Sequence, residues 1–73
     1  MASDKAFIGK NIAYLRQQKG LTQTELAFLL NVSHKAISKW ETGRGCPDIS
    51  FLPEIAKIFD VSIDLLFNGD IRS

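Results

Sequence analysis

The sequence predicts an all-α fold built from five short helices, and three observations support this prediction. Apolar residues recur at spacings of three and four, which is the period of amphipathic helices. No segment of useful length alternates apolar and polar residues as a half-buried strand does. Capping and turn residues divide the helical segments at connections only a few residues long. Helices this short bury their apolar stripes only by packing at steep angles around a common core.

The first helix is predicted over residues 6–19. Its buried stripe consists of Ile8, Ile12 and Leu15, at relative positions i, i+4 and i+7. Gly20 follows at the position where a residue in the left-handed conformation commonly ends a helix. The chain is therefore expected to leave this helix at Gly20.

The second helix is predicted to begin after Thr22, whose spacing from Glu25 matches the capping box T-x-x-E. In that motif the hydroxyl accepts a bond from the amide of the third helical residue, and the carboxylate of that residue accepts one from the cap amide. The buried stripe of this helix is predicted to comprise Leu26, Leu29 and Leu30, with Ala27 beside them.

The third helix is predicted to start directly behind the second, with Ser33 as its N-cap and Gly43 at its end. Only Asn31 and Val32 connect the two helices, so the chain must turn sharply between them. Asn31 suits this turn because asparagine tolerates the left-handed conformation better than other non-glycine residues. Ala27 supplies the small side chain that a close crossing of two helices needs.

The two faces of the third helix are predicted to have different surroundings. Ala36, Ile37 and Trp40 fall on its inner side, and we expect Trp40 to belong to the core. Its polar residues project away from that core, and only their face is free to enter a groove on a partner. These outward residues are His34, Lys35, Ser38 and Lys39.

A loop over residues 44–50, rich in turn residues, separates the third helix from a fourth one predicted over residues 51–59. Ser50 is preferred over Asp48 as the cap of this fourth helix. A start at Asp48 would place Pro53 past the first turn, where its missing amide hydrogen removes a backbone bond. Ser62 is predicted to cap a short fifth helix over residues 63–67.

Length and composition indicate one small globular domain over residues 1–73, with a core from about residue 6 to 68. No apolar run reaches the roughly 18 to 20 residues of a membrane span, and the N-terminus lacks the apolar centre of a signal peptide. We therefore expect a cytoplasmic location. Cys46 and His34, each the single residue of its type, form no metal-ligand spacing, and no catalytic motif stands out. Neither a metal, a cofactor nor an enzymatic activity is expected.

The charges are divided unevenly along the chain. Residues 1–45 hold seven basic and three acidic side chains, a net charge of +4. Residues 46–73 hold two basic and five acidic side chains, a net charge of −3. This division suggests that the first part of the chain faces a polyanion and that the second part faces away from it.

Together these segments resemble the helix-turn-helix of the phage repressor and Cro family of bacterial transcriptional regulators, the XRE type. The resemblance rests on L-T-Q-x-E-L-A over residues 21–27 and on N-V-S-x-x-x-I-S-x-W-E-x-G over residues 31–43. Residues 55–66 are similar to the family's fourth and fifth helices, so the likeness runs from Ile8 to Phe67. Asn31 departs from the family pattern, which commonly has glycine there, but the same left-handed turn stays accessible.

The resemblance implies a compact five-helix, lambda-repressor-like domain that binds double-stranded DNA. Its third helix, from Ser33 to Thr42, would lie in the major groove and read base edges. Lysine side chains there can donate to guanine O6 and N7. The expected base contacts are made by His34, Lys35, Ser38 and Lys39.

Further roles follow from the same resemblance. Gln23, at the start of the second helix, is expected to contact a DNA phosphate and to brace His34. Thr42 and Arg44 are expected to touch phosphates as well. Arg16 and Glu41 are expected to form a partly buried salt bridge that locks the first helix to the third.

A single module of this kind buries only about 600 to 1,000 Å² on DNA, so a homodimer on a two-fold operator is expected. Phe67 and Ile71 are the candidate residues of its interface. The expected outcome of binding is repression of transcription. Two alternatives stay open: an antitoxin-like module that binds a protein partner and regulates its own synthesis through DNA binding, or the N-terminal domain of a longer regulator.

Overall fold

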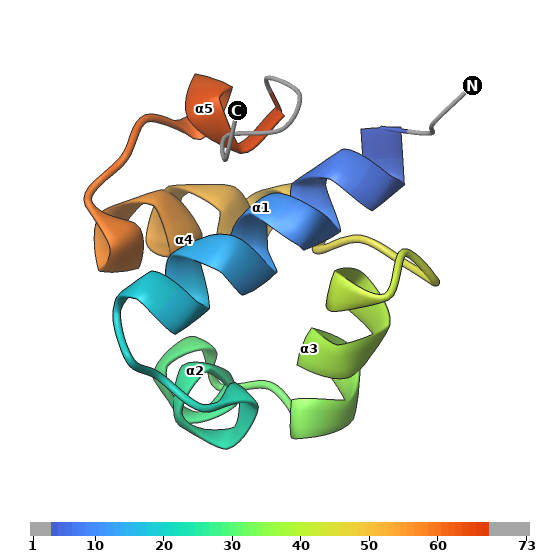
Figure 1. Cartoon of the computed structure of the whole chain (residues 1–73), viewed down its shortest axis with the longest axis vertical. Coiled ribbons are helices and arrows are strands. Elements are labelled where there is room, and N and C mark those ends of the chain that lie inside the picture. Colours follow the sequence, from blue (N-terminus) through green and yellow to red (C-terminus); the bar gives the residue numbers. More distant parts are fainter. Residues whose placement is uncertain (1–3, 68–73) are drawn as a thin grey trace.

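The computed structural model describes the backbone of residues 4–67 and the side chains of residues 8–67. Five α-helices follow one another, with a 3₁₀ turn, η1 (Ile49–Phe51), before the fourth (Figure 1). This arrangement confirms the predicted all-α fold. The first helix begins at Asp4, two residues before the predicted start. The α-helices are α1 (Asp4–Gln18), α2 (Gln23–Leu30), α3 (His34–Glu41), α4 (Leu52–Phe59) and α5 (Ile63–Phe67).

The helix α1 runs through the middle of the molecule, packing against α3 and against α5, while α2 packs mainly against α3 (Figure 1). A single core lies among the helices. Within the described part of the chain, no helix is long and apolar enough to cross a membrane. The buried apolar residues of the core are Ile8, Ile12, Leu26, Ala27, Leu30, Ile37, Trp40, Leu52, Ile55, Ala56, Phe59 and Leu66.

Leu29 does not belong to this core, so its predicted burial was wrong. The side chain is 49% exposed, whereas Leu26, Ala27 and Leu30 are buried. Because each residue turns a helix by about 100°, Leu29 lies roughly 100° away from Leu30, which marks the centre of the buried arc. The apolar spacing alone allowed either arc, and the packing of α2 against α3 selects the one that leaves Leu29 in contact with solvent.

The entry into α4 also differs from the prediction, which preferred Ser50 as the cap. Asp48 is the cap, but of the 3₁₀ turn: both the amide and the hydroxyl of Ser50 donate to Asp48 Oδ2, at 3.1 and 2.8 Å. The α-helix starts only at Leu52, so Pro53 falls in its first turn, where an amide hydrogen is not needed. The 3₁₀ turn thus removes the conflict between an Asp48 cap and Pro53.

The pKa of Asp48 is expected to respond to this cap. The side-chain hydrogen bond from Ser50, followed by the backbone one, lowers the pKa of Asp48 below its ordinary value of 3.8. The turn is therefore stabilised by the carboxylate above the unfolded-state pKa, and this contribution disappears as the pH falls through the lower, folded pKa. In a carboxyl NMR titration, Ser50→Ala should move the pKa of Asp48 back up toward 3.8. An unchanged titration would show that the hydroxyl is not the main cause.

Two close contacts of α1 were not anticipated from the sequence. A Cβ atom on Gly9 would lie only 1.8 Å from the carbonyl oxygen of Trp40, so α1 and the end of α3 approach each other backbone to backbone. Asn11, almost fully buried, donates from Nδ2 to the carbonyl of Leu66 at 3.0 Å. The first contact fixes α1 against α3, and the second fixes it against α5.

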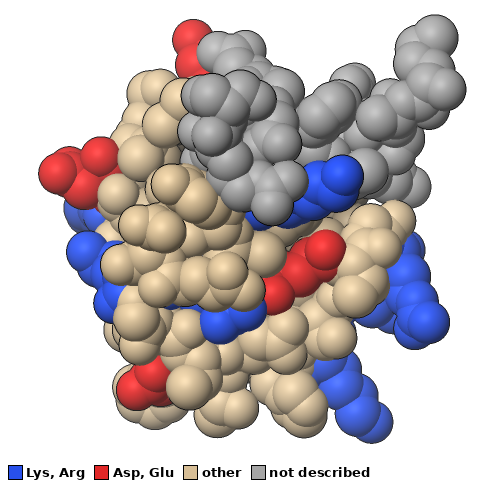
Figure 2. All heavy atoms as spheres, viewed as in Figure 1, with Lys and Arg blue, Asp and Glu red and all other residues tan. Residues whose placement is uncertain are grey.

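Basic side chains are exposed on α3 and on the loop after it, and others lie at the left-hand edge of Figure 2, beside acidic ones. Lys35, Lys39 and Arg44 are exposed on α3 and the loop after it, and basic side chains stand out at the right-hand edge of Figure 2, where Figure 1 places α3. Glu54 and Asp64 are exposed on α4 and α5. The α3 side of the molecule is therefore the one suited to a polyanion.

Candidate nucleic-acid interface

The connection between α2 and α3 has the geometry that its residues predict. Thr22 and Glu25 form the complete capping box at the start of α2. Asn31 ends α2 in the left-handed conformation, with φ 59° and ψ 44°. Ser33 then caps α3 by accepting a hydrogen bond from the amide of Ala36 at 3.2 Å. The sharp bend at Asn31 is confirmed, and α3 starts as a separate helix at His34.

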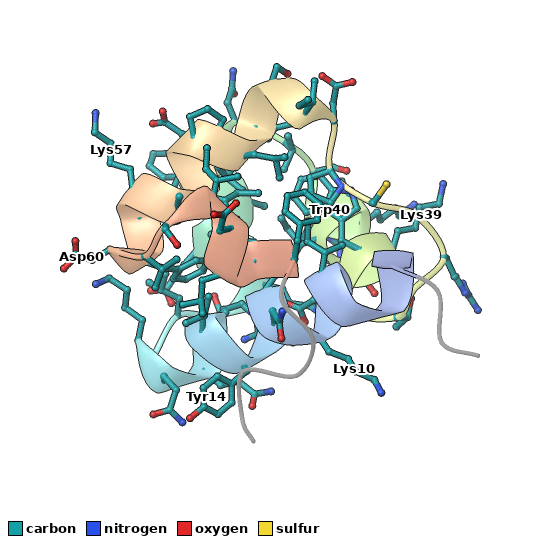
Figure 3. The ribbon with its side chains drawn as sticks, turned by 90° about the horizontal axis from the view of Figure 1, so that it is seen from above. Lys10, Tyr14, Lys39, Trp40, Lys57 and Asp60 are labelled. Atoms are coloured by element: carbon teal, nitrogen blue, oxygen red, sulfur yellow. The ribbon has the colours of Figure 1, made fainter. Side chains whose placement is uncertain are left out.

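The inner face of α3 is held by the core. Ile37 and Trp40 are buried, and the ring centroid of Trp40 lies 5.9 Å from that of Phe51, in a tilted arrangement. Figure 3 shows Trp40 pointing in among the helices while Lys39, its neighbour in the chain, points away from them. The prediction that Trp40 belongs to the core is confirmed.

The outer face of α3 forms a shallow hollow of about 430 Å³. Its described lining residues carry three basic side chains and no carboxylate, so the surface presents mainly hydrogen-bond donors. All four predicted base-contacting residues lie here, together with two of the three predicted phosphate-contacting residues. The lining residues are His34, Lys35, Ser38, Lys39, Thr42 and Arg44.

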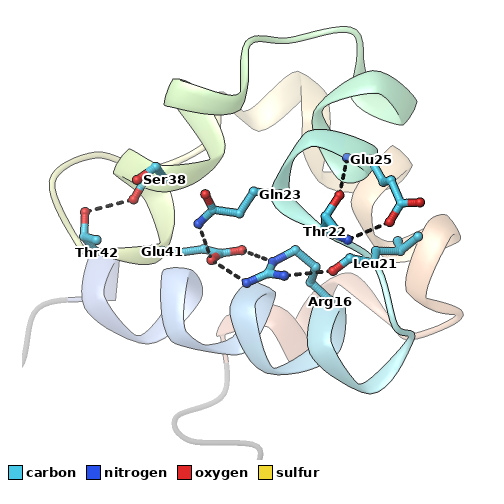
Figure 4. A network of polar contacts seen from close by, with 8 residues as sticks. All are labelled: Arg16, Leu21, Thr22, Gln23, Glu25, Ser38, Glu41 and Thr42. Atoms are coloured by element: carbon cyan, nitrogen blue, oxygen red, sulfur yellow. Dashed lines mark hydrogen bonds and ion pairs between the residues drawn. The ribbon is translucent and has the colours of Figure 1, made fainter.

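Behind this face, Glu41 joins three helices through one carboxylate (Figure 4). Arg16 of α1 donates to it twice, from Nε to Oε2 at 2.7 Å and from Nη2 to Oε1 at 3.1 Å. A third guanidinium nitrogen, Nη1, donates to the carbonyl of Leu21 at 2.8 Å. The side chains of Arg16 and Glu41 are only 13% and 7% exposed. The expected ion pair between them is therefore present, and it is partly buried.

Gln23 takes part in the same network, which was not predicted. Its Nε2 donates to Glu41 Oε1 at 2.9 Å. Among the hydrogen bonds of the described residues, none links Gln23 to His34, so the predicted bracing of His34 is not observed. Glu41 is the stronger acceptor because it is charged. One amide hydrogen of Gln23 is used in this bond, and the second is left for another acceptor.

Thr42, just after α3, caps the C-terminal end of the helix with its hydroxyl group. The hydroxyl lies 2.9 Å from the carbonyl of Ser38 and 3.2 Å from that of Lys39. The amide of Arg44 donates to the Lys39 carbonyl at 2.9 Å, and Gly43 between them has a φ of +78°. A threonine hydroxyl has a single hydrogen, so it could donate to a phosphate only by leaving these carbonyls. Arg44 has no such restriction on its side chain, which is exposed.

Comparison with known proteins identifies the family. Residues 12–66 match the family model described as Helix-turn-helix, which is most of the chain. The chain belongs to the helix-turn-helix family. A curated helix-turn-helix relative, the HTH-type transcriptional activator BcrR of Enterococcus faecalis, is 48% identical over 61 residues. That match covers 84% of this chain and 30% of BcrR.

Solved helix-turn-helix structures share the arrangement of the helices. The P22 c2 repressor, solved in complex with a synthetic operator, matches with a TM-score of 0.80 at 31% identity, over 88% of this chain and 97% of that one. SinR, a master regulator for biofilm formation solved in complex with DNA, matches with a TM-score of 0.76 at 32% identity, over 84% and 98%. The chain spans 30 to 51% of the length of the first three curated relatives.

Proposed function

We propose that this chain is a sequence-specific regulator of transcription that binds double-stranded DNA and acts in the cytoplasm. The observation that carries the proposal is the exposed basic face of α3, which the core holds from behind through Ile37 and Trp40. An α-helix presented in this way fits the major groove. The relatives named as transcriptional regulators and the neighbours solved with DNA support the proposal.

The position of each residue on this face suggests its role. We assign base contacts to His34, Lys35, Ser38 and Lys39, because they lie on the outer side of α3. Phosphate contacts are assigned to residues at the borders of the hollow and at the start of α2: Gln23, Thr42 and Arg44. Thr42 would make its contact by releasing the carbonyls of Ser38 and Lys39. Arg44 has an exposed cation, and Gln23 keeps one amide hydrogen beyond its bond to Glu41. Phosphate contacts fix the register of the protein on the duplex, and base contacts select the sequence.

The test compares specific with non-specific binding. A binding sequence is first selected from a random oligonucleotide pool. The double substitution His34→Ala and Lys39→Ala should then weaken binding to that sequence by about 100-fold, because two base contacts are lost. Binding to random DNA should weaken only a few-fold, in proportion to the lost positive charge.

Lys57→Ala is the matched control for charge. Lys57 is exposed on α4, and Figure 3 shows it on the opposite side of the molecule from Lys39. This variant should bind the selected sequence almost as well as the unchanged chain. Equal losses of the double variant on selected and random DNA would contradict base reading by His34 and Lys39.

We further propose that the chain acts as a homodimer on a two-fold operator and represses transcription by occupying it. Phe67 and Ile63 are 48% and 40% exposed and lie four residues apart, on one side of α5. Such a pair suits an apolar contact between two copies, and Ile71, the other candidate, lies outside the described residues. The small footprint of one module on DNA also favours two copies.

Phe67→Asp is expected to separate the dimer, because a charge would replace a ring in the apolar contact. The molecular mass measured by light scattering should fall to that of the monomer, and binding to the selected operator should lose its cooperativity. Phe28→Asp is the control, because Phe28 is 84% exposed on α2, outside the proposed interface. If both variants keep the dimeric mass, the α5 interface is wrong.

A further inference from the structure

We infer that each half of the operator presents two guanines, about two base pairs apart, to Lys35 and Lys39. This inference rests on the proposed function and deepens it, because it names the bases that the outer face of α3 selects. Three features of the structure lead to it: the chemistry of the exposed groups, the engagement of Glu41 behind them, and the spacing of the two lysines along the helix.

The outer face of α3 offers two cations and no anion. Lys35 and Lys39 are exposed, and an ammonium group has three hydrogen-bond donors and no acceptor. Within α3, all of which is described, Glu41 is the one carboxylate, and its side chain, only 7% exposed, lies on the side of α1 and α2. Its Oε1 accepts from Arg16 and Gln23, and its Oε2 accepts from Arg16. The network therefore keeps a carboxylate away from the reading face.

A face of ammonium donors distinguishes the four bases in the major groove. Guanine presents two adjacent acceptors, N7 and O6, whereas adenine places an amino group beside its N7 and thymine places a methyl group beside its O4. Cytosine presents an amino donor, which faces an ammonium group unfavourably. Guanine is thus the base that satisfies a lysine most completely. An exposed carboxylate at position 41 would have accepted from cytosine, but the ion pair with Arg16 prevents this.

The spacing of the two lysines sets the distance between the guanines. Lys35 and Lys39 are four residues apart, which is about 6 Å along the helix axis and almost the same direction around it. Base pairs follow one another at about 3.4 Å along the duplex axis, so an α3 that runs in the direction of that axis brings the two ammonium groups to base pairs about two steps apart. Ser38 lies between them on the same face, and its hydroxyl both donates and accepts. The base pair between the guanines should therefore be selected less strictly.

The first experiment uses the unchanged full chain and the sequences that it selects from a random double-stranded pool. Two guanines about two base pairs apart should be enriched in each half of the selected site. Replacing either of them with 7-deazaguanine removes the N7 acceptor but keeps the base pair, and it should weaken binding by about five- to tenfold. As the control, adenines outside these positions are replaced with 7-deazaadenine. This replacement should change the affinity less than twofold.

The second experiment changes the protein. The amide of a glutamine side chain can donate to adenine N7 and accept from the adenine N6 amino group. At one of the two positions, Lys39→Gln should therefore prefer adenine where the unchanged chain prefers guanine. Lys35→Gln should do the same at the other position. The two variants identify which lysine contacts which base, and their exposed positions leave the core packing unchanged.

The outcomes separate the inference from the proposed function. A defined selected site without guanines at this spacing, or one that tolerates 7-deazaguanine at both positions, would overturn the inference and leave DNA binding intact. Guanines that persist in the sites of both glutamine variants would also overturn it. A pool from which no sequence is enriched would overturn the proposed function itself, and the inference with it.

Discussion

Replacing Gly9 with alanine is expected to lower the free energy of unfolding by about 2 to 3 kcal/mol, although alanine normally stabilises a helix. The added Cβ would lie 1.8 Å from the carbonyl oxygen and 2.8 Å from the carbonyl carbon of Trp40. Both atoms belong to the backbone, so no side chain can rotate away, and α1 must move relative to α3. The same displacement would disturb the burial of Trp40, because the carbonyl that meets Gly9 belongs to this residue.

Thermal unfolding followed by circular dichroism measures this effect. A loss of 2 to 3 kcal/mol corresponds to a fall in Tm of roughly 10 to 20 °C for a domain of this size. Gly45→Ala is the matched control, because nothing lies within 4 Å of the Cβ that it would add. That variant should stay within about 0.5 kcal/mol of the unchanged chain. If the two variants unfold at the same temperature, the close approach of α1 to α3 does not exist.

Replacing Glu41 with alanine is expected to lower the free energy of unfolding by about 2 to 4 kcal/mol. The substitution would leave the guanidinium of Arg16 partly buried, with the carbonyl of Leu21 as its one remaining partner among the described residues. It would also remove the acceptor of the Gln23 amide. Removing one member of a buried pair costs more than the pair itself contributes, because the remaining charge keeps its desolvation penalty.

Denaturant titrations of this variant and of a double variant test this explanation. The double variant Arg16→Met and Glu41→Leu should be more stable than Glu41→Ala, because it leaves no charge without its partner. Glu54→Ala serves as the control, since Glu54 is exposed in the first turn of α4 and its loss should cost less than about 1 kcal/mol. If Glu41→Ala and Glu54→Ala destabilise the chain equally, the network around Glu41 contributes no more than a surface charge.

The sequence predicted the helices well because their limits depend on local chemistry. The capping box of Thr22 and Glu25, the left-handed Asn31 and the Ser33 cap each involve neighbours within a few residues, and the structure confirms all three. Local patterns also identified the outer face of α3, since the burial of Ile37 and Trp40 leaves only one side of a helix exposed. For the proposed base and phosphate contacts, the residue types and the exposed position of α3 were both readable from the sequence.

What the sequence could not predict depends on contacts between distant segments. Leu29 was misplaced because the helical period does not say where a neighbouring helix lies. Gln23 was expected to brace His34, but its amide donates one hydrogen to the charged acceptor Glu41, 18 residues away, and no hydrogen bond among the described residues links it to His34. The close approach at Gly9 left only a weak signal, a glycine in the interior of a helix, where it costs about 1 kcal/mol relative to alanine and often indicates tight packing.

The separation of the two sides of α3 has a consequence for altering the protein. The residues that hold this helix in place, Ile37, Trp40 and Glu41, lie on its inner side. The residues His34, Lys35 and Lys39 lie on its outer side and face solvent. Exchanging the exposed side chains should therefore redirect the domain to a different target sequence without a matching loss in folding stability. New DNA specificities could therefore be engineered by substituting the exposed residues of α3 alone.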